Sequence, residues 1–304
     1  MMGIVLHKLL PLYAIILIGF VAGRLITARW EAIATLLIYV IAPVVVFVGI
    51  MSAPLDIGRL ALPLVFFIIC CSLCLLFYFT ICRLWPSPLR NILAFSAATG
   101  NSGYFGLPIA IFLFGEEAFS ISVLIALGFI LYENTLGFFI TARGHHDTLE
   151  SLGRVLRLPT VYAFILAVIC NLSGLTLPAA LTELGTNFRN AYFILGMMMI
   201  GLGVAQLKTL KLDIRFISIA FLLKFLVWPI VVVGVILMDK QMFHIFSPLE
   251  HNVMLLMSLV PLPANSVALA MELGSAPEKI ATAVFLSTVF AAFYVLIISG
   301  LYFL

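Results

Sequence analysis

Long apolar stretches follow one another along almost the whole chain, and short polar connections separate them. A helix needs about 20 predominantly apolar residues to cross a bilayer. In lipid, a segment can satisfy its backbone polar groups only within a helix or a closed barrel. The pattern predicts an all-α polytopic membrane protein. We count ten candidate spans, at residues 5–23, 32–52, 60–82, 91–114, 118–142, 159–177, 190–207, 214–238, 251–273 and 280–303.

The composition excludes several other classes of protein. Of the 304 residues, 64% are hydrophobic and 10% are charged, whereas soluble domains are roughly half apolar and about a quarter charged. The net charge of +3 is too small to indicate a nucleic-acid partner. The sequence has no paired catalytic residues, phosphate-binding loop or metal motif. We therefore expect neither an enzyme nor a metal or cofactor site, apart from coupling to H⁺ or Na⁺.

Lysine and arginine residues are distributed unevenly over the connections. Eleven follow the odd-numbered spans and four lie on the other side, while Lys224 lies within the eighth span. Because positive residues mark the cytoplasmic side, we predict that both termini face outward, in a plasma membrane or bacterial inner membrane. A cytoplasmic connection at 143–158 separates residues 1–142 from residues 159–304. Each half has an odd number of spans, so the halves should be inverted repeats, as in alternating-access transporters.

The fourth span of each half is interrupted by residues that do not suit a helix, within Asn101–Pro108 and Val260–Ser266. Proline lacks an N–H group and glycine weakens a helix, so we expect both helices to break there. A break at bilayer depth persists only where it is buried in protein or lines a wet cavity. One break could be a simple kink, but two in corresponding positions favour a solute site.

The two breaks combine neutral hydrogen-bond donors with helix ends. Half-helices starting near Leu107 and Ser266 would direct their N-termini, each with roughly +0.5 of an elementary charge, at the bilayer midplane. This arrangement suits a carboxylate or another small anion, although the same side chains could serve only the broken backbone. The candidate substrate-binding residues are Asn101, Ser102, Gly103, Gly106, Pro108, Pro261, Pro263, Asn265 and Ser266.

Two ionisable residues lie at bilayer depth, where a charge costs at least about 2.5–3.5 kcal/mol. Glu133, which precedes Asn134 in the fifth span, could carry a proton, ligate sodium or serve only as a structural hydrogen-bonding group. Lys224 could pair with Glu133, attract an anion or extend its ammonium group to the cytoplasmic interface. Glu133, Asn134 and Lys224 are therefore the candidates for a role in coupling or charge.

Short motifs along the chain resemble one known family in their order and spacing. This is the auxin efflux carrier family, which includes the plant PIN-FORMED auxin transporters and bacterial carriers described as malate or malonate permeases. The motifs are Pro11-Leu12-Tyr13, Ala42-Pro43 with Phe47, Asn101 with Gly106 and Pro108, Pro159-Thr160-Val161-Tyr162, Gly196-Met197, Gly201-Leu202, Lys224-Phe225 with Pro229, and Leu262-Pro263 with Glu272.

The resemblance implies ten helices in two inverted repeats, with spans 4 and 9 crossing at their breaks as in bile-acid sodium symporters. Spans 1, 2, 6 and 7 would form a dimerising scaffold, and spans 3–5 and 8–10 a transport domain that moves in elevator fashion. Asn101 would contact the substrate carboxylate. The short central loop resembles that of bacterial members. Asn265 and Glu133-Asn134 differ from the Gly and the aromatic residues of plant members, which argues against auxin itself.

We therefore predict a secondary transporter of a small organic anion, such as a dicarboxylate or an auxin-like acid, acting in the lipid bilayer as a homodimer. One alternative is a sodium-coupled symporter of the bile-acid type, for which Glu133, Asn134 and Ser266 offer oxygen ligands. The other is a membrane sensor or enzyme without transport, and neither paired catalytic residues nor a cytoplasmic output domain supports it.

Overall fold

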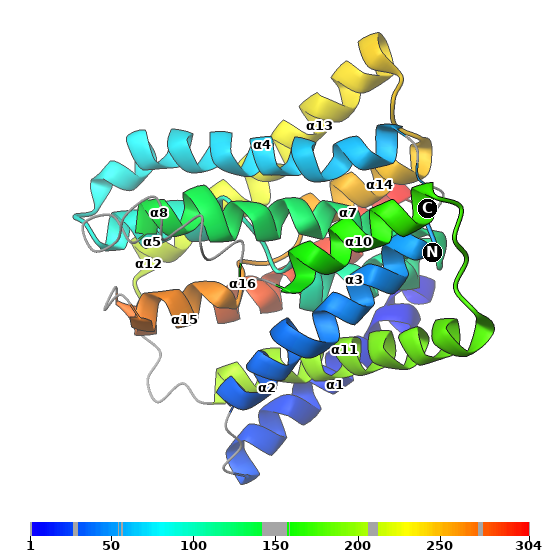
Figure 1. Cartoon of the computed structure of the whole chain (residues 1–304). Helices are drawn as coiled ribbons and strands as arrows, with labels where there is room; N and C mark the ends of the chain where they lie inside the picture. The colour runs from blue at the N-terminus through cyan, green and yellow to red at the C-terminus, as the bar shows by residue number, and fades with distance from the viewer. Residues whose placement is uncertain are drawn as a thin grey trace.

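The computed structural model describes residues 2–26, 30–53, 55, 57–141, 157, 159–205, 212–272 and 276–303, and its regular elements are all helical (Figure 1). The predicted all-α membrane class is confirmed. Among these residues, four helices are long and apolar enough to cross a membrane: Gly58–Leu84, Glu117–Thr141, Ile214–Phe243 and Pro277–Tyr302. Shorter apolar helices are Tyr13–Leu25, Leu37–Met51 and Pro159–Leu172.

The first half of the chain has helical elements in each range that hydropathy indicates. The label η marks a π-helical turn, except for η2, which is a 3₁₀ turn. In order, the elements are α1 (Met2–Leu25); α2 (Trp30–Leu36), η1 (Leu37–Ile41) and α3 (Ala42–Met51); α4 (Ile57–Phe79) and η2 (Ile81–Leu84); α5 (Leu89–Ala97), η3 (Ser102–Gly106) and α6 (Leu107–Phe114); and α7 (Glu117–Tyr132), η4 (Glu133–Gly137) and α8 (Phe138–Thr141).

The second half again has helical elements in the expected ranges. The predicted connection at 143–158 lies outside the described residues, apart from Arg157. The elements are α10 (Pro159–Leu172); α11 (Ala179–Ala205); α12 (Ile214–Leu222), η5 (Leu223–Val227), α13 (Trp228–Met238) and η6 (Asp239–Phe243); α14 (Pro248–Ser258) and α15 (Asn265–Glu272); and α16 (Pro277–Ile298) and η7 (Ser299–Phe303).

The start of the seventh span was predicted wrongly. α11 begins at Ala179 and not near residue 190. Its first turns contain Thr182, Glu183 and Asn187, which lower the local hydropathy, and these three residues are exposed. Polar residues are compatible with an exposed helical surface, so hydropathy marks the apolar part of this helix and misses its polar beginning.

Three prolines inside the helical stretches each follow a π-helical turn. Pro43, Pro108 and Pro229 occupy the first turns of α3, α6 and α13, directly after η1, η3 and η5. Proline cannot donate the i→i−4 hydrogen bond, and its ring clashes with the carbonyl four residues earlier. A π-helical turn widens the helix locally and is a recognised site of bending. The helical backbone therefore continues through each of these prolines.

The helices pack into two groups. In the first group α1 packs on α11, and α3 packs on both α10 and α11. The α1–α11 crossing needs glycine, because a Cβ at Gly19 would lie 2.2 Å from the carbonyl oxygen of Met198, and one at Gly201 would lie 2.0 Å from that of Ile16. Small residues let membrane helices approach this closely.

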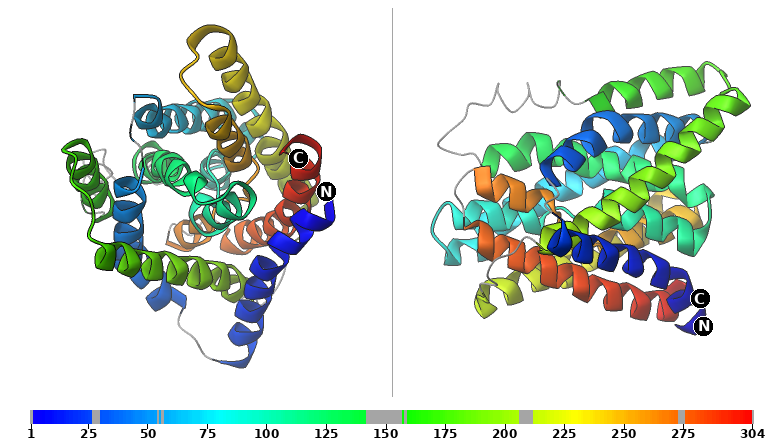
Figure 2. Two further views of the ribbon diagram at one scale, coloured as in Figure 1. Left: turned by 90° about the vertical axis from the view of Figure 1, so that its right-hand side faces the viewer. Right: turned by 90° about the horizontal axis from the view of Figure 1, so that it is seen from below.

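The second group surrounds α7, whose residues are mostly buried and which lies near the middle of the bundle (Figure 2, left). α4, α6 and α14 pack against α7, α13 packs on α14, and α16 packs on α15 and α12. The two groups touch where α3 meets α7, where α11 meets η3, and where α1 meets α6 and α16. Three expectations stay predictions: that the two groups act as scaffold and transport domain, that the halves are inverted repeats, and that two copies form a dimer.

The two ends of the described chain lie together. α1 and η7 are in contact, and both views place the N- and C-terminal marks at the same end of the bundle (Figures 1 and 2). This arrangement is the one expected for an even number of spans. The membrane face to which this end belongs stays a prediction from the charge distribution.

Candidate solute site between two broken helices

The two predicted breaks touch each other inside the second packing group. The chain is non-helical at 98–101, between α5 and η3, and at 259–264, between α14 and α15. The backbone N–H of Asn101 donates a hydrogen bond to the carbonyl oxygen of Pro261, at 2.9 Å. Each break thus supplies a partner to the other, which is how broken helices persist away from water.

In the first break the helix resumes at Ser102, five residues before the predicted start at Leu107. Asn101 is the N-cap: its side-chain oxygen accepts a hydrogen bond from the backbone N–H of Tyr104, at 3.2 Å. Its carbonyl accepts from the N–H of Gly106, at 3.1 Å. Because the Oδ1 atom of Asn101 is engaged in capping, its amide NH₂ group is the donor that remains for a solute. The interruption comes from residues 98–101, and Pro108 lies inside the resumed helix.

In the second break the helix resumes at Asn265, one residue before the predicted start. Pro261 and Pro263 both lie in the non-helical segment, as predicted. The N–H of Leu262 donates to the hydroxyl of Ser287 on α16, at 3.1 Å. Trp228 serves the other break in the same way, because its indole N–H donates to the carbonyl of Ala97 at 2.8 Å. Side chains from neighbouring helices therefore satisfy the backbone that the breaks expose.

Glu133 joins the two breaks through its two carboxyl oxygens. Oε1 accepts a hydrogen bond from the hydroxyl of Thr99, at 2.8 Å, and Oε2 accepts from the side-chain amide of Asn265, at 3.0 Å. Asn134 is directed differently, since its amide nitrogen donates to the carbonyl of Ile130 on its own helix, at 2.9 Å. Glu133 therefore links the two breaks through hydrogen bonds, whereas the amide nitrogen of Asn134 is hydrogen-bonded within its own helix.

A cavity of about 170 Å³ lies where the breaks face α3 and α11 of the first packing group. Tyr104 and Tyr192, with ring centroids 5.5 Å apart, form part of its wall. A Cβ at Gly103 would lie 2.7 Å from the hydroxyl oxygen of Tyr192, so only glycine leaves this approach open. The predicted residues that line the cavity are Asn101, Ser102, Gly103, Pro263, Asn265, Glu133 and Asn134.

The other predicted site residues lie behind the cavity wall. A Cβ at Gly106 would meet the sulfur of Met257 at 2.6 Å, and Pro108 is buried in α6. Pro261 contributes its carbonyl to Asn101. Ser266 is fully buried, and its hydroxyl has no hydrogen-bond partner within the described part of the chain. These four residues shape the breaks and do not contact the cavity.

Lys224 was predicted to pair with Glu133, to attract an anion or to reach the cytoplasmic interface. Its side chain is fully buried, so it does not extend to an interface. Its Nζ atom lies 4.5 Å from the ring centroid of Trp228 and 5.8 Å from that of Phe129. In the described structure no ion pair joins it to Glu133. A Cβ at Gly100 would lie only 2.7 Å from Nζ, so the ammonium group sits directly behind the first break.

Sequence reasoning missed several residues that complete this site. Thr99 bonds Glu133, Ser287 and Trp228 bond the breaks, and Tyr192 closes the cavity from α11. Thr99 could have been found, because it adjoins Gly100 in the interrupted segment. The other three come from distant helices, and only the packing of those helices brings them to the breaks.

Comparison with known proteins identifies the class of molecule that contains this site. Residues 4–151 match the profile of the family described as "Membrane transport protein". A relative named an uncharacterized transporter, from Methanocaldococcus jannaschii, is 26% identical over 294 residues, which cover 91% of this chain and 92% of that protein. Another uncharacterized transporter, from Methanothermobacter thermautotrophicus, is 26% identical over 198 residues, or 65% of this chain and 63% of that protein.

The protein is therefore a membrane transporter, and its first half is similar to this family. The resemblance to auxin efflux carriers is confirmed at the level of the family, and the expectation of a transporter in place of an enzyme is confirmed with it. The family profile covers the first break, and the relative from M. jannaschii is similar along both halves.

The transporter has a second cavity, of about 630 Å³, which we call the charged cavity. It lies where the end of α3 and the start of α7 face the first half of α11. Arg189 of α11 binds the carboxylate of Glu116, next to α7, through both terminal nitrogens, one of them at 3.2 Å. The guanidinium group also lies 5.0 Å from the ring centroid of Phe119. This ion pair connects the two packing groups directly.

Proposed function

We propose that the protein is a secondary transporter that moves a small organic anion by alternating access around the two touching breaks. The observation that carries this proposal is the cavity between the packing groups. Two helical segments begin at its wall, at Ser102 and Asn265, and both of these residues line it. Helix N-termini present N–H donors and a positive dipole end, so they attract anions.

The hydrogen-bond chemistry of the lining also favours an anion. The amide NH₂ group of Asn101 is available because its oxygen caps the helix. Ser102 adds a hydroxyl donor on the same wall. Neutral donors bind a carboxylate without forming a buried ion pair. Releasing the solute from such a pair would leave a buried charge without a partner, which is costly. At about 170 Å³ the cavity is smaller than the roughly 300–1,000 Å³ typical of pockets for drug-sized ligands, which favours an acid of a few carbon atoms.

The position of Glu133 supports coupling to protons. Its carboxyl group lines the same cavity that would hold the solute carboxylate. Two negative charges at one site repel each other, so we propose that the solute and a proton on Glu133 bind together. Glu133 is hydrogen-bonded to Thr99 of one break and to Asn265 of the other, so its protonation would change the hydrogen bonding of both breaks.

Coupling to sodium is the second candidate, in a symporter of the bile-acid type. The oxygen ligands near the breaks that favour it are the carboxyl oxygens of Glu133 and the hydroxyl of Ser266, which has no hydrogen-bond partner among the described residues. Sodium sites in transporters of broken helices use such oxygens together with unwound carbonyls.

The test is uptake of labelled acids by purified protein in proteoliposomes. A C4 dicarboxylate should be taken up, and imposed gradients of pH and of sodium should separate the two couplings. Asn101→Ala and Asn265→Ala should each lower uptake by at least about tenfold, since a lost hydrogen bond to a charged group costs about 1.5–3 kcal/mol. The matched control is Asn187→Ala on the exposed surface of α11. No uptake of any small acid, or equal loss in the control, would refute the proposal.

A further inference from the structure

The solute cavity has an apolar end that the proposed function does not use. On α7 the lining residues Val123, Ala126 and Ile130 precede Glu133 at helical spacing, so they form one stripe along the cavity. From Ala126 to Glu133 the helix rises by about 10 Å. Glu133 is the residue that is hydrogen-bonded to both breaks. The breaks therefore lie at one end of the cavity, and aliphatic side chains form the other end.

α3 completes this aliphatic end. A Cβ at Gly49 would lie 3.1 Å from the ring of Phe119 and 3.2 Å from a methyl carbon of Val123, so the last turns of α3 face the first turns of α7. Val45 and Val46, one turn before Gly49, line the cavity there, and Val45 also lines the charged cavity beyond it. Four buried residues make up what we call the aliphatic chamber: Val45, Val46, Val123 and Ala126.

The described residues that form the chamber offer no partner for a charge. Their side chains are aliphatic, and they lie within helices, where the backbone groups bond to one another. Tyr104 and Tyr192 are near enough to Glu133 to interact electrostatically with its carboxyl group, which places their hydroxyls toward the breaks. Arg189 lines the charged cavity and is paired with Glu116. A carboxylate in the chamber would therefore lose its water without gaining a hydrogen bond, which is costly.

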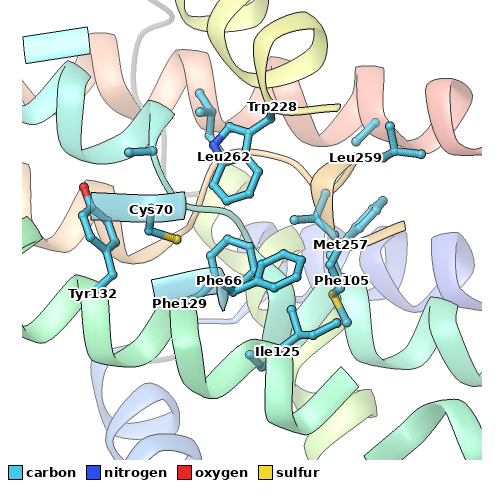
Figure 3. Packing of buried hydrophobic residues seen from close by; sticks show 14 of the residues in the cluster. Phe66, Cys70, Phe105, Ile125, Phe129, Tyr132, Trp228, Met257, Leu259 and Leu262 are labelled. Carbon is cyan, nitrogen blue, oxygen red and sulfur yellow. The ribbon is translucent and has the colours of Figure 1, made fainter. Parts of the chain in front are cut away.

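The chamber is also small and firmly supported. The whole cavity of about 170 Å³ has space for about six water molecules, at the roughly 30 Å³ that each occupies in the liquid. Phe129, which lines the cavity from α7, packs against Phe66 of α4 and Trp228 of α13, with ring centroids 5.5 Å apart in each pair (Figure 3). A close-packed interior of this kind has low compressibility. A short aliphatic tail fits the chamber, whereas a fused aromatic ring system does not.

We infer that the preferred solute is a short aliphatic monocarboxylate, with its single carboxylate at the breaks and its uncharged tail in the aliphatic chamber. The inference rests on the proposed function and names its substrate class. Burial of the apolar tail stabilises the bound state, whereas a second carboxylate in the same place would have no partner. A C4 dicarboxylate is then bound through one carboxylate and more weakly.

The test compares two acids of matched shape on purified protein at neutral pH. 4-Methylpentanoate is succinate with an isopropyl group in place of one carboxylate, so only the distal group differs. The concentration that gives half of the maximal rise in melting temperature should be at least about tenfold lower for 4-methylpentanoate than for succinate. Indole-3-acetate should give no saturable rise. Because protonated monocarboxylic acids cross lipid unaided, the same order is checked by competition of unlabelled acids with uptake of labelled succinate.

Val123→Thr tests the chamber itself. The substitution replaces a methyl group with a hydroxyl of similar size and gives the chamber one hydrogen-bond donor. The preference for 4-methylpentanoate over succinate should fall by at least about threefold, because the distal carboxylate gains a partner. Val289→Thr, at an exposed position of α16, is the matched control and should keep the preference of wild type. If Val123→Thr does not fold, the comparison of acids on wild type decides alone.

The outcomes separate failure of this inference from failure of the proposed function. Equal or tighter binding of succinate by wild type would overturn the inference and leave the proposed function standing, because an organic anion would still bind. A saturable effect of indole-3-acetate at lower concentration than that of 4-methylpentanoate would overturn it too, as would an equal change of preference in Val123→Thr and Val289→Thr. If neither succinate nor 4-methylpentanoate binds or competes, the proposed function fails and the inference fails with it.

Discussion

The two cavities of this transporter are lined in different ways. The cavity at the breaks has a mostly apolar lining, whose polar groups are amides, hydroxyls and the carboxyl group of Glu133, and no ion pair crosses it in the described structure. The charged cavity contains the Arg189–Glu116 pair and adjoins Arg59, which binds Glu117 and Glu250 at 3.0 Å each. Val45 of α3 lines both.

The two linings suit the two cavities to different tasks. A solute held by neutral donors can leave without separating two opposite charges, so the cavity at the breaks suits reversible binding. The pair of Arg189 and Glu116 joins the two packing groups, so a large movement of one group past the other would break it. Binding and restraint of movement are therefore expected to reside in separate places.

The largest effect should come from removing the titratable carboxyl group of Glu133. Glu133→Gln keeps the size of the side chain but cannot titrate. Uptake driven by a pH gradient should fall by at least about tenfold, which corresponds to 1.4 kcal/mol, while exchange of solute across the membrane should continue. The measurement is uptake and counterflow in proteoliposomes at several pH values.

Glu117→Gln, at an exposed carboxylate of the charged cavity, is the matched control for Glu133→Gln. Its dependence on the pH gradient should stay that of wild type. If Glu133→Gln behaves like wild type at every pH, Glu133 is a structural hydrogen-bonding group. If it instead weakens activation by sodium, Glu133 is a sodium ligand and the proton model is wrong.

The two breaks themselves should differ in their response to losing a proline. Pro263 lies in the non-helical segment, so Pro263→Ala should let the helix extend into it and reduce uptake by about tenfold. Pro108 lies inside α6, after a π-helical turn, so Pro108→Ala should have an effect of less than about threefold. Uptake is compared at equal amounts of inserted protein. Equal losses would show that Pro108, too, is needed to keep its helix broken.

The sequence predicted the helical class and the segments that contain both breaks, because proline, glycine and runs of apolar residues act locally. It misplaced the point where the first helix resumes, since the π-helical turn at Ser102–Gly106 accommodates Pro108. It also missed the start of α11, whose first turns are polar. The direction of Lys224 depends on the rings of Trp228 and Phe129 on two helices, and such packing cannot be read from local pattern.

The charged cavity should show a smaller effect than the breaks. Arg189→Gln and Glu116→Gln should each change the half-saturation concentration for solute by about two- to fivefold, because an exposed ion pair contributes about 0.2–1 kcal/mol. The double variant should be no worse than either single one, since both remove the same interaction. Glu183→Gln, an exposed carboxylate on the same helix α11, is the control. Additive effects would mean that the pair does not restrain movement.

The smallest effect should come from an ion pair that lies within one packing group. Asp213 caps α12, accepting from the N–H of Phe216 at 3.1 Å, and binds the ammonium group of Lys279 on α16 at 2.8 Å. The hydrogen bond from Lys279 lowers the pKa of Asp213 below its ordinary value. The stabilisation it provides is therefore complete above the unfolded pKa of about 3.9 and is lost as the pH falls through the folded pKa.

Asp213→Asn keeps the cap, because asparagine caps helices as well as aspartate, and removes only the charge. Since both partners are partly exposed, the melting temperature at pH 7 should fall by no more than about 2–4 °C. The difference from wild type should shrink as the pH approaches 3, and uptake should not change. The pair joins two helices of one group, so it need not break during movement, in contrast to Arg189–Glu116. A change in half-saturation concentration as large as that of Arg189→Gln would contradict the division between the two groups.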